Sequence, residues 1–219
     1  KIFLDYSNEM IDLQIDGKYS LNNDTDNLFI KFKGNKNYFE IYSLLGLNHC
    51  TLNISEINYL KTSNIPSKLE ILIKNSQNNY NLEKIHFSEN KNFISIKKLN
   101  ISNDLKIKSV DEIDVSFLNK KEVLNNFKIK KNLNNYDFTG QQIDGEELLE
   151  GLLKSNKKKE FSKLFDNINT SIKLNLNKLY LEKNSYLEKL TGDFDINNNK
   201  LFIAKVDAII KKKKKIYYI

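Results

Sequence analysis

The chain has 219 residues, a formal net charge of +7 and 40% hydrophobic residues. That hydrophobic share excludes disorder caused by too little apolar content. Every basic residue is lysine, so the bidentate contacts that arginine makes with guanine or phosphate are excluded. We therefore expect no nucleic-acid partner, although lysine still allows diffuse attraction to anionic surfaces.

Alternation of apolar and polar residues dominates the chain and predicts strands with one apolar and one wet face. It also predicts antiparallel pairing, because parallel strands are usually covered on both faces. Proline and glycine are scarce, so asparagine is expected to form most of the turns. In chain order the alternating runs are 11–15, 28–32, 39–41, 52–54, 69–73, 94–96, 99–101, 105–107, 113–117, 172–176, 179–181, 194–196 and 201–203.

One segment breaks this pattern, because its apolar residues have helical spacing. The spacing predicts an inserted helical segment over 144–165, with Asp144 as its N-cap and Glu147 completing a capping box. Two longer stretches, 94–117 and 172–196, share a second design: strand, short break, strand, polar turn, strand. This succession fits a meander in which each strand pairs with the next.

Chemistry-bearing residues are few. Cys50 is the only cysteine, so no internal disulfide or thiolate metal cluster can form. His49 and His86 lie in separate strand-like runs without the spacing of a zinc motif. Because no phosphate loop or nucleophile motif is present either, we expect a non-enzymatic protein with no metal and no cofactor.

The second half of the chain resembles a known family. Residues 136–149 read as a strand, a glycine, an acidic helix start and the paired leucines Leu148 and Leu149, and the leucine-rich meanders 172–181 and 187–196 follow. This succession, over roughly 94–208, resembles the AsmA-like, YhdP-type family of bacterial envelope proteins. The N-terminal membrane anchor of full-length members is missing from this sequence.

The resemblance implies a mainly β fold: a long antiparallel meander sheet curled into an open groove. It also implies a periplasmic protein, anchored in the inner membrane at full length, that passes phospholipid between inner and outer membranes without catalytic residues. Apparent strands at both chain ends make us expect that 1–219 is one continuous segment of a longer protein. The candidates for the apolar groove face are Ile94, Ile96, Leu99, Ile101, Ile113, Val115, Phe117, Ile172, Leu174, Leu176, Leu179, Leu181, Phe194 and Ile196.

Two alternatives stay open at this point. The same residues would equally fill the sealed core of a β-sandwich, since alternation does not separate the two. The protein would then be a structural or adhesive surface module that binds a protein partner. The lysine runs 211–215 and 157–159 also have two interpretations: guards on exposed edges, or contacts with an anionic membrane surface at about 1 kcal/mol per lysine.

Overall fold

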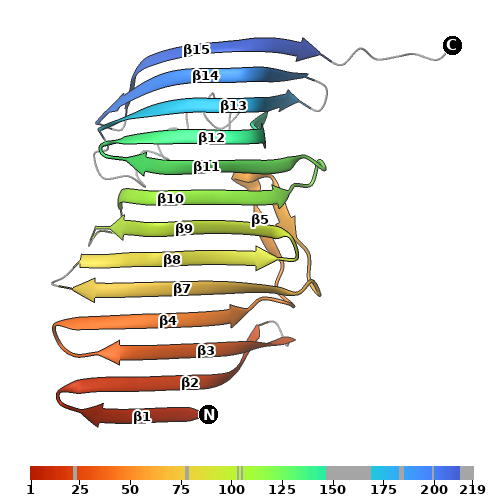
Figure 1. Ribbon diagram of the computed structural model, residues 1–219. Coiled ribbons are helices and arrows are strands. Elements are labelled where there is room, and N and C mark those ends of the chain that lie inside the picture. Colours follow the sequence, from red (N-terminus) through yellow and green to blue (C-terminus); the bar gives the residue numbers. More distant parts are fainter. Residues whose placement is uncertain are drawn as a thin grey trace.

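The computed structural model describes residues 1–21, 24–76, 79–102, 104, 106–146, 169–182, 185–198 and 200–212. Its main feature is one open sheet of thirteen strands in nearly sequential order (Figure 1). Figure 1 shows the strands stacked as a ladder, with β1 and β15 at its two ends. The strands are β1 (Ile2–Ser7), β2 (Met10–Leu21), β3 (Asp24–Gly34), β4 (Tyr38–Gly46), β7 (Ser67–Ser76), β8 (Asn79–Glu89), β9 (Asn92–Ile101), β10 (Ile107–Leu118), β11 (Leu124–Asn132), β12 (Asn135–Asp144), β13 (Thr170–Glu182), β14 (Ser185–Asn197) and β15 (Lys200–Lys212).

The mainly β, mostly antiparallel meander predicted from the sequence is confirmed, with one exception in the pairing. β12 and β13 run parallel, with Phe138 opposite Leu174. Parallel neighbours require a crossover connection of a dozen or more residues. The antiparallel neighbours follow shorter turns, except β4 and β7, which are joined by the segment 47–66. The helical segment predicted over 144–165 falls almost wholly in this connection and lies outside the described residues beyond Glu146.

The predicted strand breaks are wrong in both long stretches. Residues 92–101 form the single strand β9, although Lys98 has a φ of 50°. Residues 170–182 likewise form the single strand β13. A left-handed residue inside an antiparallel pair bends a strand without ending it, so a lysine or asparagine between two apolar runs does not mark a boundary here.

Turns use asparagine as expected, and also residues that were not expected. Asn8 and Glu9 both have positive φ between β1 and β2, as do Asn90 and Asn198 in later turns. Positive φ at both central residues is the pattern of a tight hairpin turn. Leu133, between β11 and β12, also has a positive φ of 56°, which costs a leucine more than an asparagine because the short polar side chain of asparagine can hydrogen-bond locally.

A small hairpin forms a second, two-stranded sheet whose strands do not pair with the main one. It consists of β5 (Leu52–Ile54), the 3-10 turn η1 (Ser55–Ile57) and β6 (Tyr59–Lys61). Figure 1 shows it beside one end of strands β7 to β10. The run 52–54 was predicted as one more strand of the meander, and this is wrong: β5 pairs only with β6.

Candidate functional site

Directly opposed residues form a row across all thirteen strands that is apolar except at Ser43 and Gly192; we call it the isoleucine row. Strands are spaced about 4.8 Å apart, so twelve steps give a strip about 58 Å long. No member of the row is buried; Ile2 and Val206 at its ends are exposed and the others are half-buried. The isoleucine row is Ile2, Ile15, Ile30, Ser43, Ile71, Ile85, Ile96, Ile113, Ile129, Phe138, Leu174, Gly192 and Val206.

A second row on the same face, two residues along each strand, is covered in its middle by the hairpin. We call it the core row; it contains Leu69, Phe87, Ile94, Val115, Phe127 and Leu176. Phe87 and Val115 are buried beneath Tyr59 of β6, whose ring packs edge-on against Phe87 and Phe117. The hairpin thus closes one margin of the apolar face and leaves the isoleucine row beside it partly exposed.

The opposite face of the sheet is more polar, although Phe29, Tyr42 and Leu72 also lie on it, and it carries the ion pairs between strands. Lys84 lies 2.7 Å from Glu70, and Lys128 lies 2.6 Å from Asp114. A shallow hollow of about 580 Å³ on the same face is lined mainly by charged and polar side chains of β12 to β15. The two faces therefore differ in the side chains they present. One face carries charged side chains that water solvates, and the other carries apolar side chains that the protein covers only in part.

The structure brings six of the fourteen predicted groove residues together in these two rows. Ile96, Ile113 and Leu174 lie in the isoleucine row, and Ile94, Val115 and Leu176 lie in the core row. The others are placed along the same sheet: Leu99 opposite Val110, Ile101 opposite Ile107, Ile172 opposite Phe194, Ile196 opposite Leu201, Phe117 buried beside the hairpin, Leu179 against the buried Ile143 cluster, and Leu181 near the end of β13.

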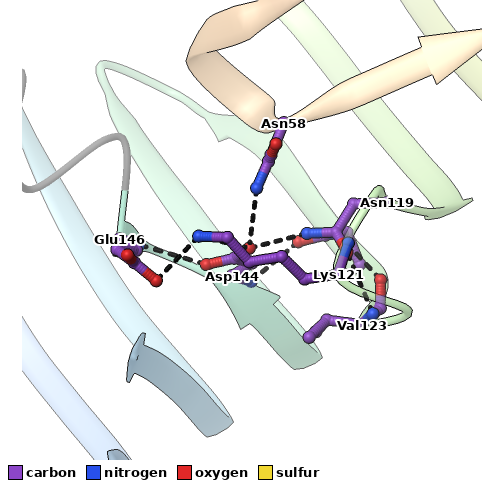
Figure 2. A network of polar contacts seen from close by, with 7 residues as sticks. Asn58, Asn119, Lys121, Val123, Asp144 and Glu146 are labelled. Atoms are coloured by element: carbon purple, nitrogen blue, oxygen red, sulfur yellow. Dashed lines mark hydrogen bonds and ion pairs between the residues drawn. The ribbon is translucent and has the colours of Figure 1, made fainter. Parts of the chain in front are cut away.

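A buried carboxylate joins the hairpin, the β10–β11 turn and the end of β12 (Figure 2). Asp144 Oδ2 accepts hydrogen bonds from Asn119 Nδ2 at 2.7 Å and from Asn58 Nδ2 at 3.4 Å. Its Oδ1 accepts from the backbone N–H of Glu146 at 3.2 Å, the type of contact expected of an N-cap. Lys121 Nζ lies 2.7 Å from Glu146 and 3.8 Å from Asp144. We call this cluster the Asp144 latch.

Both polar atoms of the Asn119 side-chain amide have hydrogen-bond partners. Its Oδ1 accepts from the backbone N–H groups of Lys121 and Val123, each at 2.9 Å, while its Nδ2 donates to Asp144. The amide orientation is therefore fixed by its partners. Asn58, at the tip of the hairpin, also accepts from the Lys120 N–H at 3.1 Å, so backbone as well as side chains connect the hairpin to this turn.

Two residues of β6, Tyr59 and Lys61, make further polar contacts. The Tyr59 hydroxyl donates to the buried Glu89 carboxylate, and burial followed by this hydrogen bond raises the pKa of Tyr59. Lys61 is 0% exposed, and its Nζ donates to the carbonyl oxygens of Cys50, Thr62 and Asn48 at 2.7, 3.0 and 3.3 Å. Burial lowers the pKa of Lys61. Sequence reasoning missed both groups, although the Tyr59–Leu60–Lys61 alternation places Lys61 on the buried side with Tyr59.

The two histidines lie at separate positions in the structure. His49 Nδ1 lies 2.9 Å from Asn64 Oδ1 at the surface, and His86 stacks on Phe93. Within the described ranges, no three His, Cys, Asp or Glu side chains lie close enough to hold a metal ion. The same part of the chain contains no helix with the length and apolar content needed to span a bilayer.

Comparison with protein-family models, curated proteins and solved structures finds no match for this chain.

Proposed function

We propose that the chain binds the acyl chains of phospholipids along the isoleucine row, as a non-enzymatic segment that passes lipid across the periplasm between two membranes. The observation that carries the proposal is the length and continuity of this partly exposed apolar strip. In this proposal the sheet curls further around the hydrocarbon to form an open groove. The AsmA-like resemblance of 94–208 supports the same function and suggests an inner-membrane anchor outside this chain.

The length of the strip favours a path along which an acyl chain moves over a pocket that holds one chain. A bilayer core about 30 Å thick holds two leaflets, so one acyl chain extends about 15 Å. A strip about 58 Å long would therefore offer room for about four chain lengths end to end. Burying about fifteen methylenes at about 0.8 kcal/mol each supplies about 12 kcal/mol, and hydrophobic contacts are non-directional, so sliding along the row costs little.

A photo-crosslinking pair tests the proposal without depending on stability. A photoreactive phenylalanine analogue is placed at Ile85, in the middle of the isoleucine row, or at the next residue His86, on the polar face. In cells or with phospholipid vesicles, position 85 is expected to crosslink phospholipid and position 86 to crosslink little. Equal labelling at both positions, or labelling at neither, would refute lipid binding along the row.

Lipid carried through purification gives a second readout. The wild-type chain, extracted mildly, is expected to carry phospholipid detectable by mass spectrometry, and Ile85→Glu is expected to carry several-fold less because a carboxylate interrupts the strip. His86→Glu introduces the same charge on the polar face and serves as the matched control. A lipid-free wild-type protein would instead favour a structural β module, for which the buried cluster under the hairpin is the supporting observation.

A further inference from the structure

The hairpin covers only the middle of the core row. Directly opposed residues extend this row beyond the hairpin on both sides, through Leu69 and Leu45 toward β3 and through Phe127 toward β12. These three residues are half-buried, whereas Phe87 and Val115 beneath the hairpin are 5% and 3% exposed. The core row lies two residues along each strand from the isoleucine row, a distance of about 7 Å. The sheet therefore carries two parallel rows of mostly apolar residues, and the hairpin interrupts one of them.

A buried polar network fixes the root of the hairpin. Asp26 of β3 is 6% exposed, and its carboxylate accepts hydrogen bonds from Asn48 Nδ2 at 2.7 Å and from the His49 N–H at 3.0 Å. Asn48 Oδ1 accepts from the Ser67 N–H at 3.0 Å, and the buried Lys61 donates to three carbonyl oxygens of the same segment. These bonds lie where the chain leaves β4 and returns to β7, so they hold the root independently of the apolar face.

The rest of the hairpin is attached through side chains and through its tip. β5 and β6 pair only with each other. At the tip the Lys120 N–H donates to the Asn58 carbonyl at 3.1 Å, and the Asn58 side chain donates to Asp144 at 3.4 Å (Figure 2). Tyr59 packs on the aromatic rings beneath it, and its hydroxyl donates to Glu89. Detaching the hairpin therefore breaks these contacts and apolar packing, but no ladder bond of the main sheet.

Both ends of the hairpin segment leave the main sheet at one place. The Leu47 N–H donates to the Ser67 carbonyl at 2.9 Å, so the start and the end of the segment are direct neighbours. A segment that is closed at its root and shares no ladder with the sheet opens locally at a lower free-energy cost than unfolding of the whole sheet. Opening exposes apolar side chains on both sides, because Leu52 and Ile54 of the hairpin pack against the buried cluster. Hydrocarbon placed between the two surfaces covers them again, since hydrophobic contacts are non-directional.

We propose that the hairpin segment 47–66 is a hinged cover: it swings away about its root at Asp26 and Lys61 while the thirteen-stranded sheet stays folded, and so uncovers the core row. The Asp144 latch at the tip holds the cover closed. When the cover opens, the core row and the isoleucine row lie side by side across the sheet, and a second acyl chain binds along the core row. That use of the open state rests on the proposed function, whereas the opening itself does not depend on lipid.

Thiol labelling in the absence of lipid tests the opening. In a Cys50→Ser background, Val115→Cys places the only thiol of the chain beneath the hairpin, at a position that is 3% exposed. This thiol is expected to react about tenfold or more faster than global unfolding of the same variant allows, because the hairpin opens alone. For the same reason its rate is expected to change little in low concentrations of denaturant. A rate equal to that of global unfolding, with the same dependence on denaturant, would show that the hairpin leaves only when the sheet unfolds and would overturn the proposal.

A disulfide between the hairpin tip and the β10–β11 turn tests what the cover controls. In the same Cys50→Ser background, Asn58→Cys with Lys120→Cys joins two residues whose backbones are hydrogen-bonded, within the reach of a disulfide. With phospholipid vesicles, a photoreactive phenylalanine analogue at Phe87 is expected to crosslink lipid several-fold more in the reduced protein than in the oxidised protein. The same analogue at Ile85 is expected to crosslink equally in both states. Equal crosslinking at Phe87 in both states, with Ile85 labelled, would refute control by the cover. Crosslinking at neither position would refute lipid binding itself, and the thiol labelling then decides the opening separately.

Discussion

Removing the carboxylate of the Asp144 latch is expected to destabilise the protein by about 3 kcal/mol. In Asp144→Ala the 2.7 Å hydrogen bond from Asn119 Nδ2 is lost, worth about 2 kcal/mol because the acceptor is charged, together with about 1 kcal/mol from the Glu146 N–H. The Asn58 contact at 3.4 Å is too long to add much. The partly exposed Lys121 pair at 3.8 Å adds less than about 1 kcal/mol.

Thermal unfolding and hydrogen exchange measure this loss at two scales. For a chain of 219 residues, about 3 kcal/mol corresponds to a fall in Tm of roughly 6–12 °C. The Lys120 N–H, which donates to the Asn58 carbonyl, is expected to exchange faster, because the hairpin tip loses its link to the β10–β11 turn.

Asp137→Ala is the matched control for this prediction. Asp137 lies on the same strand, but its carboxylate is exposed and accepts one bond from Asn132 at 3.2 Å, so its loss is expected to cost less than about 0.5 kcal/mol. Equal costs for the two substitutions, or unchanged exchange at Lys120 in Asp144→Ala, would show that the latch does not hold the hairpin.

Three further predictions concern positions elsewhere in the chain. Lys61→Met leaves three carbonyl oxygens without their donor and is expected to cost about 2–3 kcal/mol in denaturant unfolding; an unchanged midpoint would contradict this. Leu133→Asn is expected to stabilise by about 1 kcal/mol, because Leu133 has a φ of 56° and is 87% exposed. Burial alone would raise the pKa of Asp26, but hydrogen bonds from His49 and Asn48 hold that pKa below its ordinary value. The stability that this carboxylate contributes is therefore lost on acidification, and Asp26→Asn is expected to reduce the slope of stability against pH in acid unfolding.

Alternation predicted the strands and their faces well, because a half-buried strand requires a period of two. The run 28–32, for example, lies in β3, with Ile30 in the isoleucine row. The same signal does not reveal which sheet a strand joins. Leu52 and Ile54 alternate as regularly as their neighbours, yet they belong to the hairpin, because membership depends on the loops around them rather than on side-chain period.

The polar interior was harder to predict for a different reason. Lys61 and Asp144 are buried because partners satisfy them. Lys61 has three nearby carbonyls, and Asp144 has Asn119 and Asn58 from more distant segments. A sequence shows the polar residue but not its partners, and without partners burial is unfavourable. Composition therefore assigns such residues to the surface by default.

The hairpin and the isoleucine row together determine what the apolar face can do. Where the hairpin packs, Tyr59 and its neighbours bury Phe87 and Val115, and that part of the face serves as an ordinary core. Where it does not reach, Ile85 and Ile113 remain half-buried on a single-layered sheet. Exposing a largely apolar strip about 58 Å long is costly in water, and this cost is the physical basis of the proposal that hydrocarbon covers the isoleucine row.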